Sequence, residues 1–171
     1  KDISIIIVEN SNDENFKNYV ENKYKNVSCL LSRSNIGMGA GNNIGINKAK
    51  SDFVLILNPD VTLYNDTIDK LLKASKKLQN FAIMSPLCDD ISYPNYSVKN
   101  KENINYENIF EVDSLDGYCM LINKKKIKSI FKTIKFFDEN FFMYLENVDL
   151  CKRVRHNREK IFIVPTCRIK H

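Results

Sequence analysis

The chain has 171 residues, which is long enough for one domain with a sizeable core. Hydrophobic residues make up 43%, charged residues make up 27%, and the formal net charge is +5. This globular composition, with no run of about 20 apolar residues, excludes a membrane-spanning helix. The mild positive charge without a dense basic tract argues against a nucleic-acid partner. It would suit a phosphate-bearing substrate or an anionic membrane surface.

The five cysteines are odd in number and widely spaced, and no Cys-x-x-Cys pair occurs. This spacing indicates neither a zinc site nor a disulfide framework. We therefore expect reduced thiols in a cytoplasmic protein, at the inner face of the membrane if it associates with lipid.

The first half of the chain alternates apolar runs with helical patterns. Strands are predicted at residues 3–8, 27–31, 53–57 and 81–84, the last stopped by Pro86. Helices are predicted after the first strand, from Asn42 or Asn43 onward, and over residues 66–78. This order predicts an α/β fold with a doubly wound, mostly parallel sheet and right-handed crossovers.

The second half is less regular. Residues 88–111 have weak periodicity and predict a long loop of the kind that is often functional. A strand at 118–122, a short lysine-rich helix, a helix at 146–156 and a last strand at 161–164, ended by Pro165, follow. The aromatic run at 136–144 is expected to pack the start of the 146–156 helix under the sheet edge.

A polar turn follows the third apolar run. Asn58, Pro59 and Asp60 lie at its carboxyl end, the edge at which open α/β sheets bind ligands. A carboxylate held there can bind a divalent cation, and the cation can bind a diphosphate. An ordinary turn is the alternative, because Asn, Pro and Asp are common turn residues.

A glycine-rich segment at 32–41 lies between a strand and a helix, where glycine amides can approach a phosphate. Asn42 occupies the last glycine position of a Rossmann fingerprint, and the Gly-Lys-Ser/Thr of a P-loop is absent. A purely structural turn therefore explains this segment as well as a ligand-facing loop does.

Carboxylates begin the helix at 146–156. Glu146 or Asp149 could act as a general base, but Arg153 is placed for an i,i+4 ion pair with Asp149. His171, just after the last strand, is either an idle exposed residue or a metal ligand.

Taken in order, these segments resemble the family 2 glycosyltransferases over nearly the whole chain. The similarity is greatest to the rhamnosyltransferase-like branch. The segments that carry it are Glu9-Asn10-Ser11, Asn35-Ile36-Gly37, Asn42-Asn43-Ile44-Gly45, Leu57-Asn58-Pro59-Asp60, 115–122, 137–153 and Val164-Pro165 with His171.

The resemblance implies a GT-A fold, a nucleotide-diphosphate sugar donor, Mg²⁺ or Mn²⁺, and direct attack by a hydroxyl of a glycan or lipid-linked acceptor with inversion. Glu9 matches the position that contacts the nucleotide base, and Asn58 and Asp60 match the Asp-x-Asp motif. The residues expected to bind the nucleotide sugar are Glu9, Asn35, Gly37, Asn43, Asn58 and Asp60, those expected to bind metal are Asp60 and His171, and those expected to contact the acceptor are Asp116 and Gly117.

Two departures from the family pattern matter. Asn147 stands where the family has its catalytic Asp, and an amide cannot take the proton. Either Glu146 or Asp149 then substitutes as the catalytic base, or the chain is slow or inactive. The first strand also matches the family's second strand. We therefore expect residues 1–171 to be one glycosyltransferase domain that is truncated at both ends.

Two other functions remain open at this point. One is a catalytically degenerate module that binds sugar nucleotides, which Asn147 favours. The other is an unrelated doubly wound domain, such as a nucleotidyltransferase or a redox protein. Hydrolysis of a donor separates the enzyme from the degenerate module, and metal-dependent nucleotide binding separates both from the third function.

Overall fold

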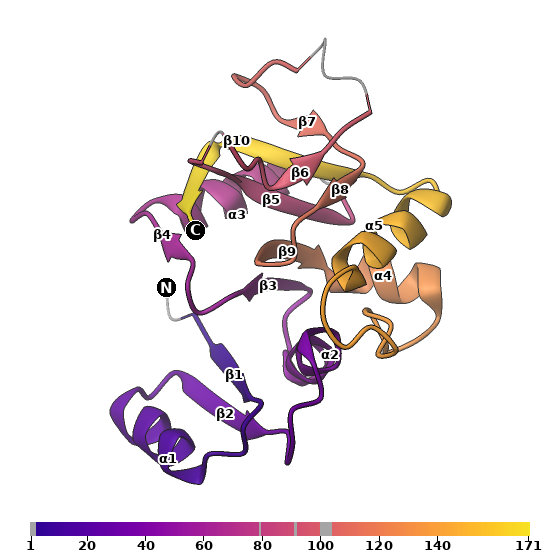
Figure 1. Ribbon diagram of the computed structural model, residues 1–171. Helices are drawn as coiled ribbons and strands as arrows, with labels where there is room; N and C mark the ends of the chain where they lie inside the picture. Colours follow the sequence, from indigo (N-terminus) through magenta and orange to yellow (C-terminus); the bar gives the residue numbers. More distant parts are fainter. Residues whose placement is uncertain (1–2, 79, 91, 100–103) are drawn as a thin grey trace.

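The computed structural model describes residues 3–78, 80–90, 92–99 and 104–171 (Figure 1). Part of the loop predicted at 88–111 therefore lies outside the described residues. The strands are β1 (Ile5–Glu9), β2 (Val27–Leu31), β3 (Phe53–Leu57), β4 (Thr62–Leu63), β5 (Ile83–Cys88), β6 (Tyr96–Ser97), β7 (Phe110–Glu111), β8 (Ser114–Leu115), β9 (Cys119–Asn123) and β10 (Ile161–Lys170). The helices are α1 (Glu14–Lys23), α2 (Met38–Lys48), α3 (Thr67–Lys77), α4 (Lys124–Phe131) and α5 (Glu146–His156).

The main sheet is mixed, so the prediction of a mostly parallel sheet is wrong. Its strand order is β3-β9-β5-β10-β4, with β7 also beside β10. Strands β5 and β10 are parallel, but β9 is antiparallel to both of its neighbours, and β4 and β7 are antiparallel to β10. The reason lies in the connection from β5 to β9, which contains no crossover helix among its described residues. When two neighbouring strands are joined without a crossover, the chain re-enters the sheet from the end at which it left, and the second strand therefore runs antiparallel to the first.

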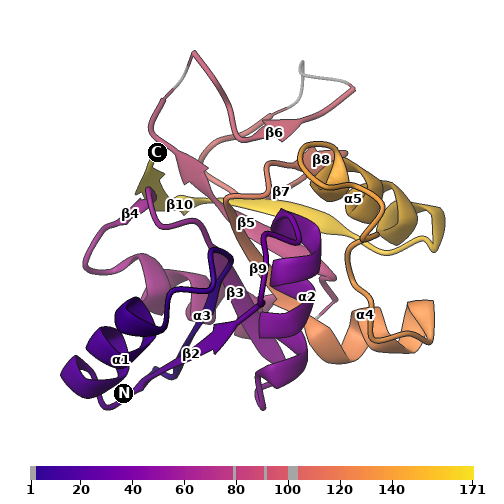
Figure 2. The same cartoon turned by 60° about the horizontal axis from the view of Figure 1, so that its bottom comes forward.

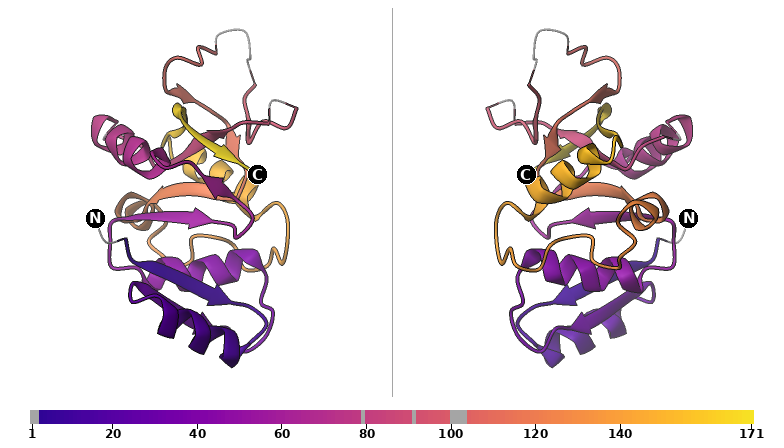
Figure 3. Two further views of the ribbon diagram at one scale, coloured as in Figure 1. Left: turned by 90° about the vertical axis from the view of Figure 1, so that its left-hand side faces the viewer. Right: turned by 90° about the vertical axis from the view of Figure 1, so that its right-hand side faces the viewer.

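Helices cover both faces of this sheet, as predicted for a doubly wound fold. Figures 1 and 3 show α3 on one face and α2, α4 and α5 on the other. The larger core contains Ile46 of α2, Ile127 of α4 and Leu150 of α5, packed with Ile83 and Ile163 from the sheet. A second core, on the other face, packs Leu71 and Ala74 of α3 on side chains of β5, β9 and β10.

Strands β1 and β2 form a separate, parallel, two-stranded sheet. Figures 1 and 3 show β1 and β3 as neighbouring strands, and Figure 3 shows them pointing the same way. No pairing between them is present within the described residues, so each leaves one edge without a strand partner. Apolar side chains near these edges are exposed, at 45% for Ile5, 38% for Phe53 and 40% for Leu57.

Two strands continue through prolines that were predicted to end them. β5 includes Pro86, which is in register with Val164 of β10, and β10 runs through Pro165 to Lys170. The register between these strands shifts between Val164 and Arg168. Proline is tolerated at such a bulge because the ladder there needs no hydrogen bond from the missing N–H.

Helix α2 begins earlier than predicted, so the last four residues of the glycine-rich segment, 38–41, are helical. Figures 1 and 2 show α2 between the β1–β2 pair and α4 and α5. A Cβ at Gly39 would lie 3.1 Å from the Cβ of Phe137 and 3.5 Å from the Cβ of Glu146. Gly37 precedes the helix with φ +84°, and a Cβ there would lie 2.3 Å from the carbonyl oxygen of Phe142. The glycines therefore allow α2 to pack closely against the segment before α5.

We expect Gly37→Ala to lower the free energy of unfolding by about 2–4 kcal/mol, because the added methyl group meets backbone and φ is positive. Urea denaturation followed by circular dichroism measures this. Gly45→Ala is the matched control, since a Cβ there meets only Val8, at an ordinary 3.4 Å. It should leave stability unchanged or raise it by up to about 1 kcal/mol. Equal effects of the two substitutions would show that Gly37 is not conformationally required.

Candidate functional site

The carboxyl end of β3 and the end of β10 converge at one edge of the main sheet. The N–H of Asn58 donates to the carbonyl oxygen of Tyr118, 2.9 Å away, which ties the turn after β3 to β9. Thr62 of β4 pairs with Lys170 of β10. This short antiparallel pair places His171 beside Asp60, with 3.5 Å between His171 Nε2 and Asp60 Oδ2.

The ring of Tyr118 holds His171 in place. The two rings are stacked, with centroids 3.9 Å apart and planes 11° apart. The pKa of Tyr118 is raised well above its ordinary value, chiefly by burial, so the phenol stays neutral. His171 is therefore ordered beside Asp60, and both side chains keep solvent access, at 34% and 69% exposed.

The donor set of Asp60 and His171 fits a divalent cation that is only partly bound by protein. A carboxylate oxygen and an imidazole nitrogen are ordinary ligands of Mn²⁺, and the carboxylate also suits Mg²⁺. Across the described part of the chain, no group of three or more His, Cys, Asp or Glu side chains converges. A cation at this pair would thus take its other ligands from substrate phosphates and water, which is how Mg²⁺ is commonly held.

Asp116 and Gly117 lie between this pair and the start of α5. The N–H of Asp116 donates to the carbonyl oxygen of Asn95 at 3.0 Å, and the amide of Asn147 donates to the carbonyl oxygen of Leu115 at 2.7 Å. A Cβ at Gly117 would lie 3.4 Å from the Cβ of Asn147. The side chain of Asp116 is exposed, yet desolvation by the surrounding protein raises its pKa, an effect that His171 partly opposes.

Of the two carboxylates predicted as bases, one is buried and the other is ion-paired. Glu146 is 3% exposed, and its Oε2 has no hydrogen-bond partner within the described residues. Asp149 forms an ion pair with Arg153, with Nε 2.7 Å from Oδ2. Arg153 in turn donates to the carbonyl oxygen of Phe136. The ion pair that the spacing of Asp149 and Arg153 predicted is therefore present.

The side chain of Asn43 forms hydrogen bonds within the protein and is buried. It is 3% exposed, and its Oδ1 accepts from the N–H groups of Phe136 and Phe137, each at 2.9 Å. Its Nδ2 donates to the carbonyl oxygen of Phe137 and to Glu139. The amide thus joins α2 to the segment that leads to α5.

Asn35 and Glu9 also shape loops. The Oδ1 of Asn35 accepts from the N–H of Gly37 at 3.0 Å. The carboxylate of Glu9 accepts from the N–H and hydroxyl of Ser11 and from the N–H of Asp13. The Ser11 hydroxyl is the largest cause of the lowered pKa of Glu9, which is therefore firmly ionised.

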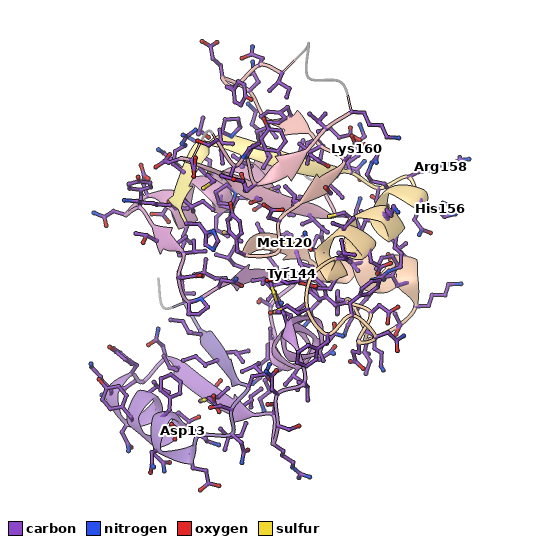
Figure 4. All side chains as sticks on the ribbon, in the orientation of Figure 1. Asp13, Met120, Tyr144, His156, Arg158 and Lys160 are labelled. Carbon is purple, nitrogen blue, oxygen red and sulfur yellow. The ribbon has the colours of Figure 1, made fainter. Side chains whose placement is uncertain are left out.

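The segment before α5 is only half buried, so the expectation for the aromatic run is wrong in part. Phe136 and Phe137 are buried, but the side chains of residues 142–145, Phe, Met, Tyr and Leu, are 55–72% exposed. Tyr144 and Leu145 have φ of 67° and 70°. Figure 4 shows Tyr144 on the loop that enters α5. The N–H of Met38 donates to the carbonyl oxygen of Phe142, and Gly37 lies close against the same carbonyl group, so an apolar strip, residues 142–145, is anchored to the start of α2 at Phe142.

Sequence reasoning missed three contributors to this site. Tyr118 and Asn95 gave no signal, because the residues that they contact at this site, His171 and Asp116, lie in other segments of the chain. Asn147 was considered only as a lost base, although its amide proves to be a hydrogen-bond donor to Leu115.

Comparison with known proteins identifies the class. Residues 1–151 match the model of Glycosyl transferase family 2, and the chain belongs to that family. It is 27% identical to the low-salt glycan biosynthesis hexosyltransferase Agl10 of Haloferax volcanii, over 92% of the chain and 54% of that protein. It is also 27% identical to the rhamnosyltransferase WbbL of Escherichia coli K12, over 97% of the chain and 72% of WbbL.

A third relative is the N-acetylglucosaminyl-diphospho-decaprenol L-rhamnosyltransferase of Mycobacterium tuberculosis, at 24% identity over 99% of the chain and 66% of the relative. The chain thus spans little more than half of Agl10 and larger shares of the other two.

Solved structures confirm the GT-A fold. GalNAc-T7 with UDP, GalNAc and Mn²⁺ superposes with a TM-score of 0.77 at 14% identity, over 98% of the chain and 37% of that structure. Residues 1–349 of Staphylococcus aureus TarS in complex with UDP superpose with a TM-score of 0.70 at 13% identity, over 99% of the chain and 51% of that structure.

We expect Asn43→Ala to lower the free energy of unfolding by about 3 kcal/mol, because two buried N–H groups and a carbonyl lose their partner. Asn47→Ala is the matched control, since Asn47 lies one turn further along α2 and makes one exposed bond, to Ile134. It should cost less than about 1 kcal/mol. Urea denaturation of both variants checks this, and a smaller loss for Asn43→Ala than for Asn47→Ala would contradict it.

Proposed function

We propose that this chain binds a nucleotide-diphosphate sugar and transfers the sugar to a hydroxyl of a glycan or lipid-linked acceptor. The observation that carries the proposal is the convergence of Asp60 and His171 at the carboxyl edge of β3, the edge at which α/β sheets bind ligands. Membership of the glycosyltransferase family supports it. So do the UDP bound in both structural relatives and the Mn²⁺ in one of them.

The names of the relatives suggest the substrate class. Agl10 is named a hexosyltransferase, and the mycobacterial relative is named for a sugar on a diphospho-decaprenol, which is a lipid-linked acceptor. A hexose or deoxyhexose donor and a glycan or lipid-linked acceptor are therefore the substrates that we propose. The donor side comprises Glu9, Asn35, Gly37, Asn43, Asn58 and Asp60. Asn35 and Asn43 contribute by fixing the loop and helix next to the donor.

The reaction we infer is a single displacement with inversion. The acceptor oxygen attacks the anomeric carbon, the bond from that carbon to the diphosphate breaks, and the electron pair leaves with the nucleoside diphosphate. A Mg²⁺ or Mn²⁺ ion held by Asp60 and His171 would neutralise the leaving diphosphate. The ordered stack of Tyr118 on His171 keeps one of these ligands in position before substrate binds.

The acceptor side is proposed to lie at Asp116 and Gly117, beside the exposed strip of residues 142–145. The described helices include none with the length and hydropathy of a bilayer span. Peripheral contact with a membrane that carries the acceptor would use this apolar strip together with the net charge of +5. The five cysteines are buried free thiols, which supports a reducing compartment such as the cytoplasm.

A module that binds sugar nucleotides without turnover is the second candidate. Asn147 favours it, because the residue at this position cannot accept a proton. The seclusion of Glu146 and the ion pair of Asp149 point the same way. Release of nucleoside diphosphate from a donor separates this candidate from the enzyme.

We expect Asp60→Ala to weaken binding of UDP in the presence of Mn²⁺ by at least tenfold, about 1.4 kcal/mol, because the cation loses its only carboxylate from the Asp60–His171 pair. His171→Ala should weaken it less, since an uncharged ligand is lost. Isothermal titration calorimetry with and without Mn²⁺ measures both effects. Asp52→Ala, at the opposite end of β3, is the control and should bind as the wild type does. Unchanged affinity in Asp60→Ala would remove the proposed metal role.

A further inference from the structure

The proposed reaction needs a group that takes the proton of the acceptor hydroxyl. Positioned general bases of this kind are usually His or carboxylates with access to substrate. Glu146 is 3% exposed beneath α2, and Asp149 is paired with Arg153. Asn147, between them, carries an amide. The carboxylates at the start of α5 are therefore poorly placed to contact an acceptor.

Asp116 is the accessible carboxylate of this neighbourhood. Its side chain is exposed, and no hydrogen bond or ion pair to it is found within residues 3–78, 80–90, 92–99 and 104–171. It lies two residues from Tyr118, whose ring stacks on His171 next to Asp60. It also lies next to Gly117, which approaches Asn147. Asp116 thus stands between the proposed cation site and the start of α5.

The peptide group between Leu115 and Asp116 is fixed through both of its polar atoms, while the carboxylate of Asp116 has no partner within the described residues. On one side, its N–H donates to the carbonyl oxygen of Asn95. Asn95 is fully buried, and its side chain is bound to Ser85, Pro86 and Cys88 of β5. On the other side, the amide of Asn147 donates to the carbonyl oxygen of Leu115. Such preorganisation is what a catalytic carboxylate requires.

We propose that Asp116 is the general base of this chain and that Asn147 is its positioning residue. The inference rests on the proposed transferase function. In the step, the proton of the acceptor hydroxyl passes to the carboxylate of Asp116 as the acceptor oxygen bonds to the anomeric carbon. The anomeric carbon–oxygen bond to the diphosphate breaks, and its electron pair leaves with the nucleoside diphosphate.

The amide at position 147 complements the carboxylate at position 116. An ionised Asp cannot donate to the carbonyl oxygen of Leu115, so an acid at 147 would lose the bond that fixes the residue before Asp116. Asp116 directly precedes Gly117, and a Cβ at Gly117 would lie 3.4 Å from the Cβ of Asn147, so positions 116 and 147 belong to neighbouring parts of the chain. In this proposal, the amide at position 147 holds the backbone before Asp116, and Asp116 supplies the carboxylate that position 147 lacks.

Turnover of three donors, UDP-glucose, UDP-N-acetylglucosamine and dTDP-rhamnose, tests this, with release of nucleoside diphosphate as the readout and Mn²⁺ present. With the donor that the wild type uses fastest, Asp116→Asn should reduce kcat by about 10²–10⁴-fold while UDP affinity stays unchanged. Asp116→Glu should retain more turnover than Asp116→Asn. Asp52→Asn makes the same chemical change at the far end of β3 and should leave kcat unchanged.

Substitution of Asn147 gives the more decisive test. Asn147→Asp should raise turnover when added to Asp116→Asn and should give no gain in the wild type. Thermal melting of each variant confirms that it is folded. Wild-type kcat in Asp116→Asn, or a loss of UDP affinity that matches the loss of kcat, would overturn the inference and leave the transferase function standing. A wild type that binds UDP with Mn²⁺ but turns over none of the donors would overturn both.

Discussion

The site depends on one buried amide. Asn43 bonds to the backbone of residues 136–137 and to Glu139, and this fixes the segment that leads to α5 against α2. Gly37 and Gly39 make the approach close enough for those bonds. The start of α5 is placed by that segment, and its Asn147 then holds Leu115 next to Asp116. An interaction within the protein, rather than a contact with substrate, therefore sets the geometry around Asp116, where we propose the acceptor side.

The opposite side of the site depends on strand pairing. His171 reaches Asp60 because β10 continues past Pro165 and pairs with β4 for two residues. A strand that ended at Val164, as the sequence predicted, would leave His171 in a tail without fixed position. The bulge at Pro165–Cys167 is thus what brings the last strand to Asp60, where we propose the cation site.

The apolar runs and the turn at Asp60 could be predicted because they depend on local sequence. The strands at 27–31 and 53–57 agree with the structure, and the helices near α3 and α5 agree closely. The direction of β9, the continuation of two strands through proline and the burial of Asn43 depend on partners up to 96 residues away, which local patterns do not contain. The same limit explains why the sequence indicated only a missing catalytic acid at Asn147 and not a hydrogen-bond donor. Its partner, Leu115, is 32 residues distant.

The separate β1–β2 sheet has a consequence for the self-association of this polypeptide. β1 and β3 run side by side in the same direction, and within the described part of the chain each has one edge whose backbone donors and acceptors have no strand partner. An extended segment lying parallel between them would bond to both and join the two sheets into one continuous sheet. In its absence these edges are templates for foreign strands, bordered by the exposed side chains of Ile5, Phe53 and Leu57. The 171-residue polypeptide should accordingly self-associate as its concentration rises, and a short apolar peptide that pairs with both edges should suppress this.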